Sequence, residues 1–218
     1  MSLKDANGQQ CTVETGIRAI VEEYFGNLFF TGEPTGIEEL MQKVNPTINA
    51  EINEALDKPI CDTEIKEALF QMHPHKSPGP DGMNTLFYQK FWDVVGEGVC
   101  SLVRTWWDGQ FNLRSINTTS VVLIPKCNNP TKITEYRPIS LCNVLYKIIS
   151  KTLANRLKGY LNNITTENQS AFTPRRLITD NALIAFKSFP AMKRGGEGRE
   201  GCVAWKMEKS KAYDRVEG

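Results

Sequence analysis

The chain has 218 residues, of which 40% are hydrophobic and 23% are charged, a composition typical of a folded protein with one or two domains. Its longest apolar runs are only a few residues, and residues 1–10 lack the apolar core of a secretory signal, so a membrane protein and a secreted protein are both excluded. We therefore expect an intracellular protein, in the nucleus or the cytoplasm.

The net charge of +1 conceals two halves of opposite sign. Residues 1–120 carry 9 Lys and Arg against 17 Asp and Glu, whereas residues 121–218 carry 17 Lys and Arg against 8 Asp and Glu. A basic half indicates a polyanionic partner such as nucleic acid, although an unevenly charged solvated surface gives the same count.

The six cysteines are far apart in the sequence, and none forms a Cys-x-x-Cys pair. Zinc sites need closely spaced ligand pairs, so this pattern favours free thiols of a reducing compartment. His73 and His75 lie two residues apart but have no third ligand nearby in the sequence, which argues against a metal site there.

Hydrophobic periodicity predicts a helical first half. Residues 73–83 interrupt it with a segment dense in Pro and Gly, which predicts tight turns. Backbone amides near Lys76 could take a phosphate, but Pro78 and Pro80 have no N–H, and this favours a structural turn. We expect helices at residues 13–29, 36–44, 62–72 and 85–107, the last interrupted near Gly96 and Gly98.

The second half predicts a hairpin, two helices and a late strand. The β-branched stretch 118–126 and the short stretch 136–141 are joined by a polar turn and form the hairpin. Its geometry brings Lys126 and Arg137 to the same end, where two cations could clamp a phosphate, although they could equally be solvated turn residues. Helices are expected at 143–161 and 177–189, a flexible charged loop at 191–201, and a strand at 202–208.

The late strand alternates apolar and polar residues, which directs Glu208 to the face opposite Trp205 and Met207. A carboxylate at a strand end can bind a divalent metal, and Tyr213, one helical turn beyond, could form the floor of such a site. The alternative is that Glu208 is a surface acid and Tyr213 a core residue, because a single carboxylate carries little specificity.

Seven segments, taken in order, resemble the reverse transcriptase of non-LTR (LINE-type) retrotransposons, especially those of plants. They are "SPGPDG", "FYQKFWDVVG", "LIPK", "YRPISLCNVLYKIISKTLANRL", "NQSAF", "ITDN" and "KAYDRVE". The resemblance runs from about residue 13 to the last residue. Each motif alone is weak, whereas the fourth segment and the ordered set are specific.

The resemblance implies an α+β fold of the right-hand polymerase type. The fingers would be largely helical with a β-hairpin, and the chain would also contain the first strand of an incomplete palm. The implied domains are a connector at 1–60, the fingers at 61–200 and the start of a truncated palm at 201–218.

The implied activity is RNA-directed DNA synthesis, a nucleotidyl transfer assisted by two Mg²⁺ ions. The implied partners are an RNA template, a DNA primer and a deoxynucleoside triphosphate (dNTP). By motif, Arg137 would contact the triphosphate with Lys126 beside it, and Tyr213 would be the aromatic gate that rejects a ribose 2′-hydroxyl. Glu208 stands where the family has its first metal-binding aspartate.

Three departures from the family pattern lead us to expect no activity from this chain alone. Glu208 is one methylene longer than the family's aspartate, Arg175 stands where the family usually has glycine, and the sequence contains no Asp-Asp pair. Mg²⁺ demands near-ideal octahedral geometry, and a displacement of about 1 Å can cost about a hundredfold in rate. We expect a copy from a decayed or truncated element; the alternative is a non-catalytic remnant that binds nucleic acid.

Overall fold

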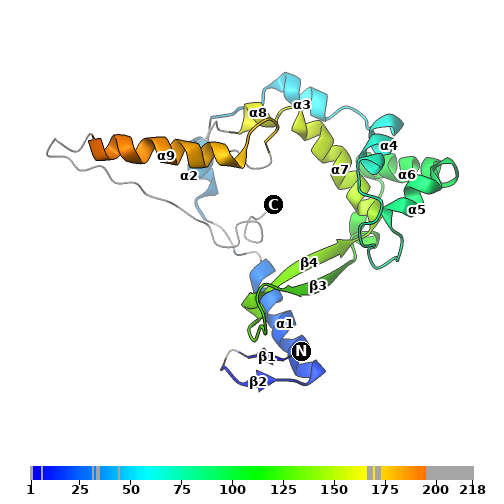
Figure 1. Ribbon diagram of the computed structural model, residues 1–218. Coiled ribbons are helices and arrows are strands. Elements are labelled where there is room, and N and C mark those ends of the chain that lie inside the picture. Colours follow the sequence, from blue (N-terminus) through cyan, green and yellow to red (C-terminus); the bar gives the residue numbers. More distant parts are fainter. Residues whose placement is uncertain are drawn as a thin grey trace. The chain divides into compact units, whose positions relative to one another are not determined.

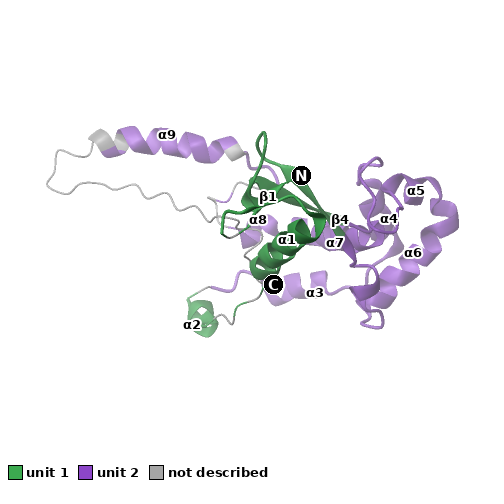
Figure 2. Cartoon of the chain, turned by 90° about the horizontal axis from the view of Figure 1, so that it is seen from below, with its two compact units in different colours: residues 1–44, 120–141, 206–218 green, residues 45–119, 142–205 purple. Residues whose placement is uncertain are grey.

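The structure is a computed structural model (Figure 1), and it describes residues 2–5, 7–30, 32, 35–43, 45–165, 169 and 173–194. The described residues fall into two compact units, coloured separately in Figure 2. Unit 1 combines the N-terminal residues up to 43 with residues 120–141. Unit 2 contains residues 45–119 and the described residues from 142 onward.

Unit 1 is built from two small two-stranded sheets and a long helix. The strands β1 and β2 pair antiparallel, with Leu3 opposite Cys11, and β3 pairs with β4 to form the hairpin that the sequence predicts. The elements are β1 (Leu3–Lys4), β2 (Gln10–Cys11), α1 (Glu14–Phe29), α2 (Ile37–Gln42), β3 (Thr119–Pro125), the 3-10 turn η2 (Ile133–Glu135) and β4 (Tyr136–Cys142).

The core of unit 1 lies between α1, the N-terminal strand and the β3–β4 hairpin. Leu3 is fully buried there together with Ile133 and Tyr136. The backbone N–H of Lys4 donates to the carbonyl of Thr131 at 2.7 Å, which fastens β1 to the loop of the hairpin. The apolar face of α1 completes this core with Ile17, Ile20, Val21, Tyr24 and Phe25.

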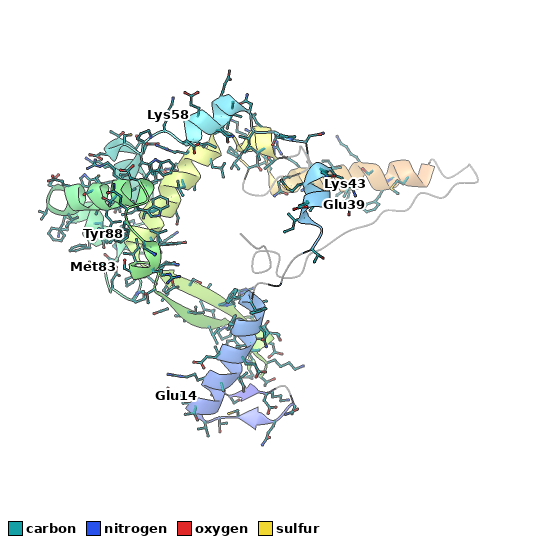
Figure 3. The ribbon with its side chains drawn as sticks, turned by 180° about the vertical axis from the view of Figure 1, so that it is seen from behind. Glu14, Glu39, Lys43, Lys58, Met83 and Tyr88 are labelled. Atoms are coloured by element: carbon teal, nitrogen blue, oxygen red, sulfur yellow. The ribbon has the colours of Figure 1, made fainter. Side chains whose placement is uncertain are left out.

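The short helix α2 has no buried residue. Its one ion pair joins Lys43 Nζ to Glu39 Oε1 at 2.9 Å across one helical turn (Figure 3). Both side chains are exposed, and such pairs contribute only a few tenths of a kcal/mol. Ile37, Leu40 and Met41 are exposed as well, so the stability of α2 does not come from packing within the described residues.

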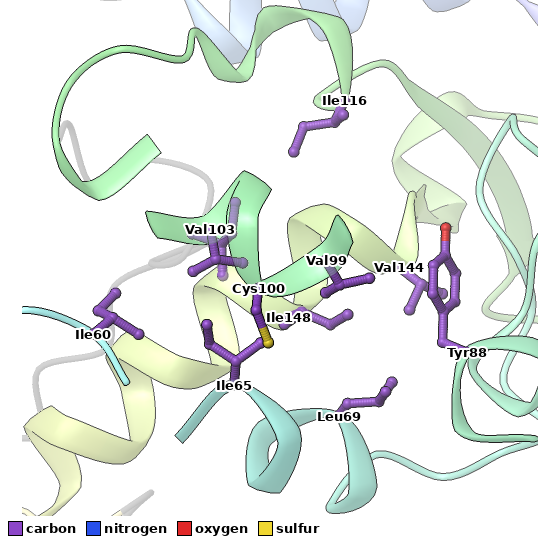
Figure 4. Close-up of a cluster of buried hydrophobic side chains, with 11 residues drawn as sticks. Ile60, Ile65, Leu69, Tyr88, Val99, Cys100, Val103, Ile116, Val144 and Ile148 are labelled. Atoms are coloured by element: carbon purple, nitrogen blue, oxygen red, sulfur yellow. The ribbon is translucent and has the colours of Figure 1, made fainter. Parts of the chain in front are cut away.

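Unit 2 is helical, and its core lies between α4, α5, α6 and α7 (Figure 4). Ile65 and Leu69 of α4 are one turn apart and fully buried, as is Ile148 of α7. The elements are α3 (Ala50–Leu56), α4 (Asp62–Phe70), α5 (Thr85–Lys90), α6 (Trp92–Trp107), the 3-10 turn η1 (Leu113–Ser115), α7 (Val144–Lys158), α8 (Leu161–Ile164) and α9 (Ile178–Arg194).

Two sequence-based expectations about the helices of unit 2 are wrong in detail. The helix expected at 85–107 breaks at Phe91, not near Gly96 and Gly98, both of which lie inside α6. Gly96 is instead a packing position, since a Cβ there would come within 2.8 Å of the Trp92 ring. In α7, Leu157 is 40% exposed rather than buried.

Thr152 of α7 is buried, although the spacing of apolar residues in the sequence does not predict this. Its hydroxyl donates to the carbonyl of Ile148 at 2.9 Å, so the polar atom is satisfied inside the helix. The helix expected at 177–189 also continues through Pro190 to the end of α9. The strand predicted at 202–208 lies outside the described residues.

Arg156 of α7 ties three elements of unit 2 together, an arrangement we call the Arg156 clasp. Its guanidinium has five N–H groups, and all five donate to oxygen atoms of the protein. The acceptors are both carboxylate oxygens of Glu64 and the carbonyls of Leu56, Lys58 and Pro59.

The clasp also has an aromatic side, because the Arg156 guanidinium lies 5.2 Å from the centre of the Trp107 ring. Glu64 in turn accepts the backbone N–H of Cys61 at 2.9 Å, which closes the first turn of α4. One arginine thereby joins α7 to the end of α3, the start of α4 and the end of α6.

The pairing of Glu64 with Arg156 makes the stability of unit 2 depend on pH. The hydrogen bond from Arg156 lowers the pKa of Glu64 from its ordinary 4.5 to about 2, despite partial burial. A lowered folded-state pKa means that the stabilisation is complete above pH 4.5 and is lost as the pH falls from about 4.5 to 2.

We therefore expect the urea midpoint of unit 2 to fall over this pH window, and to fall less in Glu64→Gln, which cannot titrate. Denaturation series at pH 6, 4 and 2.5 measure both slopes. Because every other carboxylate is common to the two proteins, equal slopes would show that Glu64 is not the group responsible.

Candidate functional site

The register of the β3–β4 hairpin is fixed by contacts near both of its ends. The backbone N–H of Lys126 donates to the carbonyl of Glu135 at 2.8 Å, and the Thr119 hydroxyl lies 3.5 Å from the Cys142 sulfur. Both contacts belong to one antiparallel register. It places Val122 opposite Ile139 and Ile124 opposite Arg137 on one face of the hairpin.

That face of the hairpin is apolar and exposed. Val122 is 44% exposed, Ile124 46% and Ile139 40%. The opposite face carries Leu123 and Tyr136, which pack into the core of unit 1. Arg137 thus stands at one end of an uncovered apolar face, while the other face is used for folding.

The two predicted cations of the hairpin have different surroundings. Lys126 donates from Nζ to the carbonyl of Thr134 at 2.8 Å, which uses one of its three N–H groups to cap the turn. Arg137 is exposed, and no described residue pairs with its guanidinium. All the donors of the Arg137 guanidinium are therefore without a partner among the described residues, whereas Lys126 is partly engaged.

Glu135 holds the turn between the two strands. Its carboxylate accepts the backbone N–H groups of Thr131 at 2.7 Å and Lys132 at 3.1 Å. These bonds, first of all the one from Lys132, lower the pKa of Glu135. The Glu135 carboxylate therefore shapes the loop at the tip of the hairpin.

In the loop at residues 73–83, several backbone amides already have partners within the loop, which favours the structural turn. The N–H groups of Lys76 and Gly82 donate to the carbonyls of His73 and Gly79, and the N–H of Met83 donates to Asp81 Oδ1. These donors are not free for the phosphate that the sequence allowed. The loop ends where the Tyr88 hydroxyl donates to Met83 Sδ at 3.7 Å (Figure 3), and burial raises the pKa of Tyr88.

The remaining predicted site residues, Glu208 and Tyr213, lie outside the described residues, so their roles stay predictions. Within the described ranges, no group of three His, Cys, Asp or Glu side chains could hold a metal ion. His73 and His75 have ring centres 5.9 Å apart.

Arg175 confirms the prediction that its position requires unusual backbone freedom. Its φ is 65°, in the left-handed region that glycine adopts without strain. A residue with a Cβ pays about 1 kcal/mol or more there. A glycine here, as the family resemblance implies, would adopt this turn before α9 without strain.

Comparison with known proteins shows which family this part of the chain resembles. Residues 124–217 match the family model described as reverse transcriptase (RNA-dependent DNA polymerase), a range that contains all four predicted site residues. Over 204 residues, 92% of its own length, the chain is 31% identical to the transposon TX1 uncharacterized 149 kDa protein of Xenopus laevis. Residues 124–217 are part of a reverse transcriptase domain.

A second relative narrows the type of reverse transcriptase. The chain is 28% identical over 140 residues, 64% of its length, to the retrovirus-related Pol polyprotein from type-2 retrotransposable element R2DM of Drosophila melanogaster. Together the two relatives support a segment of a non-LTR, LINE-type reverse transcriptase. The chain spans 15% and 12% of the lengths of these relatives. A plant origin stays a prediction.

Membership of this family implies, in general terms, a nucleic-acid template and the use of divalent metal ions. The α+β fold that the sequence predicts, helical with a small hairpin, agrees with this membership. Among the described helices, none combines the length and apolar character needed to cross a bilayer. The domain boundaries at residues 60 and 200 stay predictions.

Proposed function

We propose that this chain forms the fingers and the beginning of the palm of an RNA-directed DNA polymerase. Its β3–β4 hairpin would bind the triphosphate of the incoming dNTP. The observation that carries the proposal is the exposed guanidinium of Arg137, which pairs with none of the described residues, at the end of an apolar face inside the segment that matches the family.

Three features of the hairpin suit it to bind a nucleotide: a guanidinium, an apolar face and a second positive charge. A guanidinium presents a planar fork that donates two parallel hydrogen bonds to phosphate oxygens. The neighbouring face of Val122, Ile124 and Ile139 offers apolar contact without competing hydrogen-bond donors. Lys126, held by Thr134, adds positive charge beside Arg137.

Glu208 is the one residue that we propose as a ligand of Mg²⁺. Carboxylate oxygens are the ligands that Mg²⁺ prefers, so the donor set of Glu208 fits the ion, although its extra methylene changes the reach. When bound, the metal would neutralise charge on the triphosphate. Tyr213 would exclude a ribose 2′-hydroxyl, as its place in the family motif implies.

Replacing Arg137 with Ala is expected to weaken dNTP binding by about tenfold, because two charge-assisted hydrogen bonds are lost. Arg137→Lys should recover only part of the affinity, since an ammonium cannot form the paired contact. Titration calorimetry of the purified chain with dNTP and Mg²⁺ measures both values.

Arg114→Ala is the matched control, because Arg114 is also exposed but lies on η1. If Arg137→Ala binds dNTP as well as the unchanged chain does, the assignment of the hairpin is wrong. Salt-dependent binding of RNA without any binding of dNTP would support the non-catalytic alternative instead.

A further inference from the structure

Asn143 stands at the start of α7, where the chain leaves the hairpin. Asparagine before a helix usually accepts a hydrogen bond from an N–H of the first turn. Asn49, Asn84 and Asn112 behave in this way, since their side chains accept from Ile52, Phe87 and Arg114 respectively. Asn143 differs, because its side chain makes no bond to its own helix.

The side chain of Asn143 is instead shared between two other segments of unit 2. Its Nδ2 donates to the carbonyl of Ile116 at 3.1 Å, and its Oδ1 accepts the backbone N–H of Asp81 at 3.3 Å. The residue is 7% exposed, so water does not replace either bond easily. Ile116 precedes β3 and Asn143 follows β4, so one amide bridges the two ends of the hairpin.

The loop at residues 77–82 packs closely against Asn143, through Gly79. A Cβ on Gly79 would lie 2.4 Å from Asn143 Oδ1 and 2.5 Å from its backbone nitrogen. Lys147, one turn into α7, donates from Nζ to the carbonyl of Ser77 at 3.3 Å. Glycine at position 79 is therefore needed for contact with another segment, not for a special φ.

We propose that Asn143 is a positioning residue that fixes the two ends of the β3–β4 hairpin and locks them to the loop at residues 77–82. The role rests on the proposed function in one respect, because the hairpin carries Arg137. The residue acts through hydrogen bonds to the backbone and touches no substrate.

Asn143→Asp separates this role from ordinary helix capping. Aspartate is as good an N-cap as asparagine and suits the helix dipole, so a cap would tolerate the change. The bridge would not, because a carboxylate oxygen would face the carbonyl oxygen of Ile116 with no proton between them. Asn84→Asp and Asn49→Asp are the matched controls, since both side chains act only as acceptors in the described contacts.

Amide hydrogen exchange of the full chain at pH 7 is the test. In Asn143→Asp, exchange of the amides of residues 116–123 and 139–143 should rise by about tenfold or more, while the amides of α4 change by less than about twofold. The two control variants should stay within about twofold throughout. A role in stability alone would raise exchange in α4 as much as in the hairpin.

Gly79→Ala provides a second route to the same result if the aspartate variant folds poorly. It should loosen the same amides, whereas Gly98→Ala should not, since nothing lies within 4 Å of a Cβ at residue 98. The proposal is overturned if Asn143→Asp matches Asn84→Asp, or if exchange rises equally in α4.

A dNTP titration of the same variants connects the bridge to the hairpin's proposed task. Asn143→Asp should weaken binding by about fivefold, and adding it to Arg137→Ala should cause no loss beyond the roughly tenfold loss of Arg137→Ala alone. If the unchanged chain binds no dNTP, the proposed function fails, and the exchange experiment alone still decides the role of Asn143.

Discussion

Replacing Arg156 with Ala is expected to lower the free energy of unfolding of unit 2 by about 3 kcal/mol or more. Its side chain is only 11% exposed. Truncation would leave the Glu64 carboxylate and three backbone carbonyls without the donors that now satisfy them. The contact with the Trp107 ring would be lost at the same time.

Urea denaturation followed by tryptophan fluorescence measures this loss, since three of the four tryptophans belong to α6. Arg156→Lys should restore less than half of it, because an ammonium has three donors where five are used. Arg104→Ala is the control: its ion pair with Asp62 is about half exposed and should contribute less than about 1 kcal/mol. Equal losses at residues 104 and 156 would contradict the clasp.

Replacing Leu3 with Ala is expected to cost unit 1 about 3 kcal/mol, a loss of the size seen when a buried leucine is truncated. Leu3 has no exposed surface and fills the space between α1 and the loop of the hairpin. Hydrogen exchange of the amides of α1, β3 and β4 measures the effect, because these elements share the core that Leu3 completes.

Leu40→Ala is the matched control, since Leu40 of α2 is 63% exposed and its truncation should change exchange very little. The amides of α4 and α6 should also be unchanged in Leu3→Ala. If the exchange of α1 is the same in both variants, Leu3 is not the anchor of unit 1.

The sequence predicted most of the longer helices and the β3–β4 hairpin because their signals are local, whereas α3, α8 and the β1–β2 pair were not predicted. The apolar spacing of α1, α4 and α7 and the β-branched run of β3 depend only on neighbouring residues. Breaks were less predictable: the glycines of α6 suggested an interruption, but Gly96 is there to admit the Trp92 ring. Trp92 lies one turn before Gly96 on the same helix, so this contact is local, but the two glycines alone did not indicate it.

Contacts between distant segments were missed because local sequence patterns do not show which residues meet across the fold. Asn143 carries the sequence signal of a helix cap, while its side chain serves Ile116 and Asp81. Arg156 looks like a solvated charge in a basic half, and Leu3 like part of a loose terminus. Each is recognised only when segments that are far apart in the sequence are brought together.

The candidate site was predictable to the extent that it rests on the hairpin. Pairing two strands brings Lys126 and Arg137 to one end, and the register confirms that arrangement. The difference between them, with Lys126 engaged by Thr134 and Arg137 unpaired, depends on the turn and was not predictable. The roles of Glu208 and Tyr213 still rest on the family resemblance.

The close approach of Gly79 to the start of α7 has an evolutionary consequence. Asp81 and Asn143 are 62 residues apart in the chain yet share one hydrogen bond; because Asp81 donates its backbone N–H, the bond constrains the path of the loop and not the residue type at position 81. A Cβ at position 79 would also lie 2.5 Å from the backbone nitrogen of Asn143 and 2.6 Å from the carbonyl carbon of Cys142, so a smaller side chain at 143 would not make room for it. Among homologues, glycine should therefore be kept at position 79 whatever residue stands at 143, unless the length of the loop changes.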